Sequence, residues 1–404
     1  MDRTGIVEKI KQISYEDFII FLIPFAVFTI YLYVFNSGLL TFDSFNQVHQ
    51  IATGNFTTFH PFFHTFIEML CIGIYPSVAS YCVVQITVFS IMWMCICKYF
   101  RKTKRHFILQ VIITSAISLI PLNAIYSIML WKDVLFSYFL MFTCFLVKIL
   151  IDKDEVNGSF IILFAFVMAC TAQLRYNGLI LIIILLIVLS AYLYKKDKSK
   201  RVYIAVPALT VIFILLIASL NVVYDVEDNQ KDTFYTKVVH LLSDYDLYLD
   251  LSNDDGAKIH KVIPRKNIEK FYSATYSDPA YFNSNYTAYA NNKMDYISMA
   301  VKYSILNPVH FVKYLFDSSP WMWKITRDSD WSGSVYNTNV DKIKEYFYNQ
   351  GRTPEGDFDN VSIKNSQKDY YNKLNEFVNN FNANSITQTL FMSPAFTCIY
   401  LLYY

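Results

Sequence analysis

Seven polar residues stand at the ends of apolar segments and carry side chains that could do chemistry. They supply carboxylates, imidazoles, cations and an amide: Asp43, His60, His64, Lys132, Asp133, Arg175 and Asn177. Carboxylates and imidazoles act as general bases, while Lys and Arg neutralise phosphates. These residues come from three separate stretches of the chain, so they can form one site only if the fold brings those stretches to one face.

Asp43 is the one carboxylate between Ser37 and His60, a stretch without Lys or Arg. It could accept a proton, or bind a divalent cation such as Mg²⁺ or Mn²⁺ together with Asn46 or Gln47. An Asp before an amphipathic stretch can equally serve as a helix N-cap. The sequence alone leaves these alternatives open.

His60, His64 and Glu68 are spaced at i, i+4 and i+8, which predicts one shared face of a short helix over 61–75. That face could bind a metal or orient a phosphate through imidazole donors. The HExxH zinc motif is absent, so the pattern favours hydrogen bonding over zinc. Alternatively, the two histidines simply reach water at a membrane surface.

Lys132 and Asp133 are the only charged residues between Arg105 and Lys148. Ionisable groups at membrane depth are costly and usually face a cavity or a partner. They could therefore line a site, or form a plain interfacial ion pair with each other.

The turn Arg175-Tyr-Asn-Gly178 adds a guanidinium whose planar fork matches a phosphate. Asn177 and Gly178 suit a tight turn. Arg175 could instead be an anchor at the membrane interface.

The elements that must position these residues are predicted to be membrane helices. The 404-residue chain is 54% hydrophobic and only 17% charged, whereas a soluble protein carries more charge. About 20 apolar residues span a bilayer, which predicts eight spans: 18–36, 77–97, 107–127, 134–150, 159–174, 178–194, 202–223 and 386–404. We expect an all-α polytopic membrane protein with its N-terminus inside.

The orientation follows from the basic residues. The clusters at 98–105 and 195–201 fall on the inner side, while Lys132 and Arg175 are the only basic residues of the short outer loops. This threading places all seven candidate residues on the outer face of the cell membrane. The last segment ends at Tyr404 without a basic flank, as a shortened chain would.

Three regions are expected from this threading. Residues 1–223 form a membrane body with seven spans and outer juxtamembrane helices at 37–76, 224–385 form a mainly helical extracytoplasmic domain, and 386–404 form the final span. Within 224–385, 293–306 and 308–318 are predicted amphipathic helices, while 252–256 and 351–360 are predicted loops.

These residues together resemble a poorly characterised branch of the bacterial GT-C-type membrane glycosyltransferases. The matching motifs are an outer-loop Asp, an HPxxHT stretch, a WKD element and an RxNG turn, here Asp43, His60–Thr65, Trp131–Asp133 and Arg175–Gly178. The resemblance covers residues 15 to about 225 and extends loosely to 307–313. It departs from the family's paired-acid motif because Ser44 follows Asp43.

The resemblance implies transfer of a sugar from a polyprenyl-phosphate donor to a cell-envelope glycan or lipid acceptor. Asp43 and Asp133 would be the catalytic acids, with a divalent cation near Asp43. His60, His64, Lys132, Arg175 and Asn177 would hold donor or acceptor, and outer-domain tryptophans such as Trp323 could stack on sugars. Membrane lipid would surround the protein, and no nucleic acid is expected as a partner.

Two other functions remain open. A transporter or flippase of lipid-linked glycans would carry ionisable groups near the midplane of the membrane, but the span interiors are nearly free of charge. A non-catalytic sensor or assembly protein would leave the four motifs scattered in space.

Overall fold

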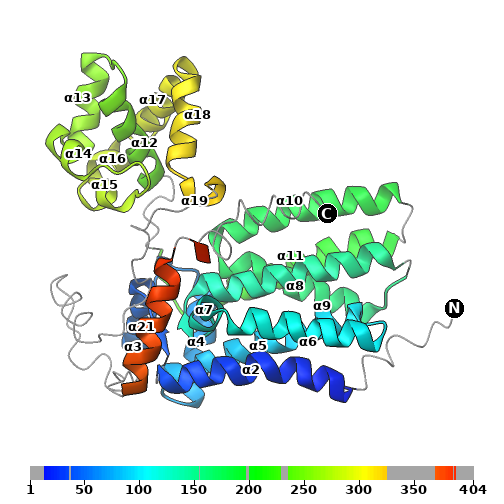
Figure 1. Cartoon of the computed structure of the whole chain (residues 1–404). Coiled ribbons are helices and arrows are strands. Elements are labelled where there is room, and N and C mark those ends of the chain that lie inside the picture. Colours follow the sequence, from blue (N-terminus) through cyan, green and yellow to red (C-terminus); the bar gives the residue numbers. More distant parts are fainter. Residues whose placement is uncertain are drawn as a thin grey trace. The chain divides into compact units, whose positions relative to one another are not determined.

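The computed structural model describes residues 13–35, 38–153, 155–196, 200–228, 235–324, 369–384 and 386–387. The chain divides into two compact units (Figure 1). Unit 1 comprises 1–228 and 333–379, and unit 2 comprises 229–332 and 380–404. The described residues 235–324 of the predicted block 224–385 lie in unit 2, while 224–228 and 369–379 lie in unit 1. The described segment near residue 378 belongs to the core of unit 1.

Unit 1 is built almost entirely of helices. Its elements are α2 (Tyr15–Val34), β1 (Leu39–Leu40), α3 (Phe42–Thr53), α4 (Phe62–Ile74), α5 (Val78–Phe100), α6 (Lys104–Leu119), α7 (Pro121–Ser127), β2 (Met129–Leu130), α8 (Lys132–Asp152), α9 (Gly158–Leu174), α10 (Tyr176–Lys195), α11 (Lys200–Val223) and α21 (Asp369–Ala383), whose last residues lie beyond unit 1.

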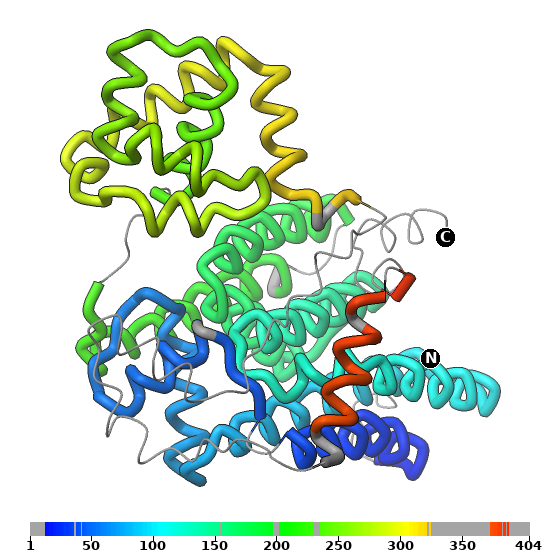
Figure 2. The backbone as a smooth tube through the Cα atoms, turned by 60° about the vertical axis from the view of Figure 1, so that its left-hand side comes forward, coloured from blue at the N-terminus to red at the C-terminus, as the bar shows by residue number. Residues whose placement is uncertain are grey.

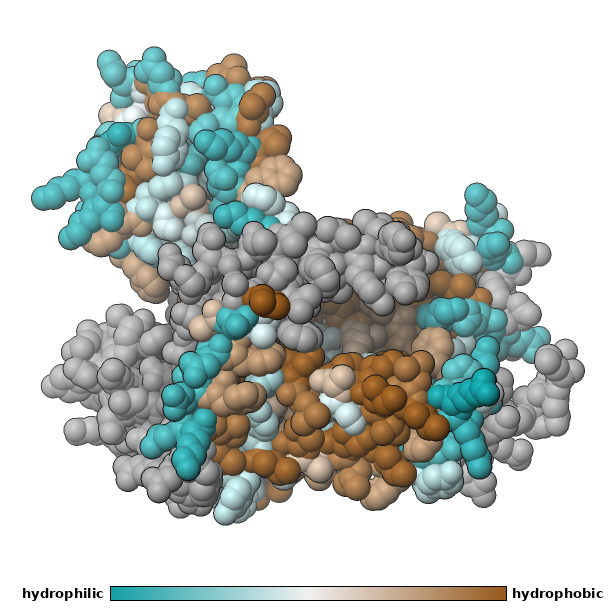
Figure 3. Space-filling view, in the orientation of Figure 1, coloured by the Kyte–Doolittle hydropathy of each residue, from teal (hydrophilic) through white to brown (hydrophobic). Residues whose placement is uncertain are grey.

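Among the described residues, α2, α5, α8, α10 and α11 are long and apolar enough to cross a membrane. The pair α6 and α7 makes a sixth if counted as one broken span, because it bends by 73° at Pro121. Proline cannot donate the backbone hydrogen bond that would continue the helix. Figure 3 shows a broad apolar surface over this body. An all-α, membrane-embedded architecture is thus supported.

The structure differs from the predicted eight spans in two places. The segment 107–127 is a bent pair rather than one straight helix. The segment 159–174 corresponds to α9, which has 17 residues and is shorter than a full span. The segment 386–404 lies outside the described residues apart from 386–387.

Helix α9 packs among α8, α10 and α11. Its small residues Ala165, Ala169 and Ala172 are buried, which allows close approach of neighbouring helices. Gly178 lets α10 pack closely against α9, because a Cβ at this position would lie only 2.4 Å from the Thr171 carbonyl oxygen. Gly178 therefore permits helix packing and does not lie in the tight turn that the sequence suggested.

Unit 2 is a separate helical domain with its own core. Its elements are α12 (Tyr235–Tyr248), α13 (Asn253–Val262), α14 (Arg265–Phe271), α15 (Asp278–Phe282), α16 (Tyr286–Asn291), α17 (Lys293–Leu306), α18 (Pro308–Asp317) and α19 (Pro320–Trp323). Figure 2 shows these helices, coloured green to yellow, as one group. Buried tyrosines dominate the core, among them Tyr235, Tyr245 and Tyr289.

The predicted helices at 293–306 and 308–318 are confirmed by α17 and α18. The predicted loop at 252–256 is wrong, because Ser252 caps α13 and residues 253–256 form its first turn. A capping serine followed by acidic residues is a helix-start signal that outweighs the Asn/Asp/Gly composition. The predicted loop at 351–360 lies outside the described residues.

Candidate functional site

A short parallel strand pair joins the two parts of the chain that carry the central residues. Leu39 of β1 pairs with Met129 of β2, and Leu40 pairs with Leu130. The Ser44 hydroxyl, one turn into α3, donates to the Leu130 carbonyl. This pairing sets the start of α3 beside the start of α8, so Asp43 and Lys132 meet although 89 positions separate them.

Gln85 of α5 holds the second strand in place. Its Nε2 carries two hydrogens and lies within hydrogen-bond distance of three carbonyl oxygens, those of Tyr126 at 3.1 Å, Ser127 at 3.0 Å and Met129 at 3.1 Å. The side chain is fully buried. Gln85 was not among the predicted site residues. The one feature of the sequence that points to it is a polar amide side chain within an apolar span.

Asp43, Lys132 and His60 form the centre of the cluster. Lys132 Nζ lies 2.6 Å from Asp43 Oδ2 and 3.4 Å from His60 Nδ1. His60 is buried, whereas the Asp43 side chain keeps 42% of its surface exposed. Thr41, not Asp43, caps α3, so the N-cap alternative for Asp43 is wrong. The Asp43 carboxylate is therefore paired with Lys132 and partly open to solvent.

The charges around Asp43 and His60 determine their protonation. Burial opposes ionisation of Asp43, but Lys132 and then His60 outweigh it, so the pKa of Asp43 lies below its usual value. Burial, reinforced by Lys132 and opposed by Asp43, lowers the pKa of His60 to about 4. At neutral pH, Asp43 is a carboxylate and His60 a neutral imidazole whose Nδ1 accepts from Lys132.

The lowered pKa of His60 predicts a specific pH response. Between pH 6.5 and about pH 4 the unfolded chain binds more protons at this residue than the folded chain, so the protein loses stability as pH falls through that window. His60→Gln should remove this contribution. Between pH 7 and pH 4.5, the melting temperature of the variant should therefore fall less than that of the wild type. Thermal unfolding of both proteins in detergent measures this; equal falls would contradict it.

Asp133 and Arg175 add a second carboxylate and a second cation. Arg175 Nε lies 2.9 Å from Asp133 Oδ1, although that oxygen receives no well-directed hydrogen bond. The guanidinium also stands over the Phe136 ring, 5.7 Å from its centroid. Lys132 and Asp133 therefore pair with residues from other segments and not with each other.

His64 is fully buried and has other partners than the Asp43–Lys132–His60 centre. Gln47 Nε2 lies 2.9 Å from His64 Nδ1, and His64 Nε2 lies 2.7 Å from the Tyr81 hydroxyl. Glu68, also fully buried, stands 3.3 Å from His64 Nδ1. His60 precedes α4, which begins at residue 62, so the predicted single face carrying His60, His64 and Glu68 does not form.

Asn177 and Trp323 were also predicted to hold substrate groups. Asn177 is exposed in the first turn of α10, and no described hydrogen bond joins it to the cluster. Trp323 is 41% exposed, and its Nε1 donates to the Phe316 carbonyl.

The described residues near Asp43 do not fit a divalent cation. Lys132 occupies Asp43 Oδ2. Asn46 Oδ1 accepts from Gln50, and the Gln47 amide faces His64 and Thr65. No group of three or more His, Cys, Asp or Glu residues suited to a metal occurs in the described chain. The described residues thus show no ligand set for the cation that the resemblance implies, and its presence stays a prediction.

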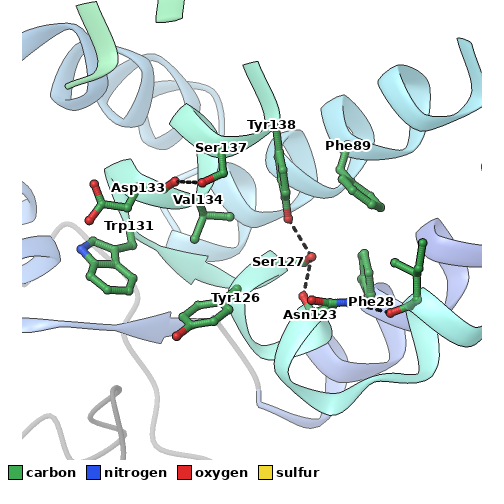
Figure 4. A pocket seen from close by; sticks show the side chains of 11 residues that line it. Phe28, Phe89, Asn123, Tyr126, Ser127, Trp131, Asp133, Val134, Ser137 and Tyr138 are labelled. Atoms are coloured by element: carbon green, nitrogen blue, oxygen red, sulfur yellow. Dashed lines mark hydrogen bonds between the residues drawn. The ribbon is translucent and has the colours of Figure 1, made fainter. Parts of the chain in front are cut away.

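A cavity of about 300 Å³ opens beside Asp133. Figure 4 shows Trp131 and Asp133 at one end and Phe89 at the other. Tyr138 and Ser127 join in a 2.9 Å hydrogen bond along its wall. The cavity therefore offers mainly apolar and aromatic walls with a charged group at one end.

No protein-family model, no curated protein and no solved structure matches this chain.

Proposed function

We propose that the protein is a GT-C-like membrane glycosyltransferase. It transfers a sugar from a polyprenyl-phosphate donor to a cell-envelope acceptor on the extracytoplasmic side. The observation that carries the proposal is the gathering of an ionised carboxylate, a neutral imidazole and two cations: Asp43, His60, Lys132 and Arg175, with Asp133 between the two cations. A sensor with scattered motifs would not require this gathering.

The cluster supplies the groups that such a transfer needs. The acceptor hydroxyl oxygen bonds to the anomeric carbon while the bond from that carbon to the phosphate oxygen breaks. Asp43 takes the hydroxyl proton, and the electron pair leaves with the phosphate. Lys132 and Arg175 stabilise that negative charge.

The ion pairs couple these two events. Before the transfer, the Asp43 carboxylate compensates the charge of Lys132, and the Asp133 carboxylate compensates that of Arg175. When Asp43 accepts the proton it becomes neutral, so the charge of Lys132 is no longer compensated. Lys132 then attracts the leaving phosphate more strongly than before the transfer. The cavity beside Asp133 adds an apolar surface for part of a lipid carrier.

The test is reconstitution of the purified protein in vesicles with a radiolabelled polyprenyl-phosphate sugar and envelope acceptor. Formation of a new glycosidic bond is the expected result. Movement of the donor across the bilayer without that bond would instead identify a transporter or flippase.

Arg175→Gln should reduce kcat/KM for the lipid donor about 100-fold, because one of the two phosphate-neutralising cations is lost. Arg175→Lys should retain part of the rate, since it keeps the charge without the planar fork. Donor titrations of the three proteins measure this. A wild-type rate for the glutamine variant would remove Arg175 from the site.

A further inference from the structure

One face of unit 2 is apolar and open to solvent. It is formed by the end of α17 and by α18, and we call it the α17–α18 face. Its members are Val301, Ile305, Leu306, Val309, Val312, Leu315 and Phe316. Val309 is 83% exposed and Ile305 is 72% exposed. Figure 3 shows apolar residues gathered on this side of the unit. Contiguous apolar surface of this kind marks an interaction site.

The fold of unit 2 imposes this exposure. His310 Nε2 lies 2.6 Å from Asp244 Oδ2, and the Tyr314 hydroxyl lies 2.8 Å from His240 Nδ1. His310 and Tyr314 are four residues apart, so they share one side of α18 and hold it against α12. Val309, three and seven residues before Val312 and Phe316, lies on the opposite side.

The chain connection keeps unit 2 close to a lipid surface. Residues 202–223 of α11 form an apolar segment long enough to span a bilayer. Glu227 pairs with Phe56 and Thr58 of unit 1, so only residues 229–234 separate unit 1 from Tyr235, the first residue of α12. A connection of that length reaches at most about 25 Å. The bilayer is therefore within reach of unit 2 at a high effective concentration.

The composition of the face favours lipid tails over an anionic headgroup. Within α18, Lys313 and Asp317 offset each other, and no basic cluster flanks them. Aliphatic and aromatic side chains on one side of a short helix are typical of helices lying in the membrane interface. We propose that the α17–α18 face inserts into the interfacial layer of the bilayer, with Ile305, Leu306 and Val309 among the acyl chains.

This insertion anchors unit 2 to the membrane and does not depend on the proposed glycosyl transfer. It also does not depend on anionic lipid. A bilayer of zwitterionic phosphatidylcholine should therefore suffice, and high salt should leave the contact unchanged.

The test uses the full chain in phosphatidylcholine nanodiscs, with a photoreactive diazirine amino acid at position 309 or 312. The control carries the same group at Glu269, an exposed charged position on α14. Irradiation followed by mass spectrometry should give lipid adducts at 309 and 312, at least ten-fold above the control and unchanged in 1 M NaCl. Adducts to another segment of this chain, to a second copy or to water only would overturn the proposal.

A second experiment tests whether the lipid adduct requires the apolar face of a folded unit 2. Val312→Asp, with the diazirine at 309, should reduce the lipid adduct several-fold while leaving the His310 and Tyr314 contacts intact. Equal lipid adduct yields with and without the aspartate would also overturn the proposal.

Discussion

Replacing Asp43 by Asn should lower the rate of sugar transfer about 1000-fold, within the range that a general base contributes. The amide cannot take the acceptor proton, and it leaves Lys132 without the carboxylate that lies 2.6 Å from it. Because half-exposed Asp43 makes a surface-accessible ion pair, stability should change little. Initial rates with saturating donor and acceptor measure the effect.

Asp152→Asn provides the matched control. Asp152 pairs with Lys148 and accepts from the Tyr99 hydroxyl at the other end of the same helix, α8. This variant removes a Lys-paired carboxylate from the same element without touching the cluster, so its transfer rate should equal that of the wild type. If the two variants lose activity equally, Asp43 has no special role. A wild-type rate for Asp43→Asn would exclude it as the base.

Replacing Gln85 by Leu should both destabilise the protein and abolish transfer, although Gln85 touches no candidate catalytic group. The change removes the amide that contacts three carbonyls just before Lys132. The Tyr126 and Met129 carbonyls keep backbone N–H donors, but the Ser127 carbonyl loses the Gln85 donor. Leaving a buried carbonyl unpaired costs about 1–3 kcal/mol. It also releases β2, whose pairing with β1 sets the distance between Asp43 and Lys132. Thermal unfolding and transfer rates, measured below the melting temperature of the variant, report the two effects.

Gln110→Leu separates stability from positioning. Gln110 Nε2 donates to the Cys97 carbonyl, and its Oε1 accepts from Arg101, in another part of unit 1. Its loss should destabilise the protein to a similar degree but leave transfer intact. If both glutamine variants retain activity, β2 does not position Lys132. If both lose it equally, destabilisation alone explains the effect.

Much of the architecture could be predicted from local sequence. Long apolar runs form helices because a buried backbone must satisfy its own hydrogen bonds, and α2, α5, α8, α10 and α11 follow the predicted segments closely. The start of α18 at Pro308 was also evident, since proline is suited to the first turn of a helix. Where Pro121 interrupts an apolar run, hydropathy alone could not show the 73° bend.

The residue types able to do chemistry were determined by the sequence itself, because few charges occur in the apolar body and each therefore stands out. Their partners were decided only by the tertiary structure. Lys132 pairs with Asp43 through a strand contact between segments almost ninety residues apart. Asp133 pairs separately with Arg175, which precedes α10. His60 and His64, equally prominent in sequence, are both buried but have different partners: His60 contacts Lys132, and His64 contacts Gln47 and Tyr81. They do not share one helix face, because α4 begins only after His60. Hydrogen-bond direction and burial depend on distant neighbours, which periodicity along one segment does not encode.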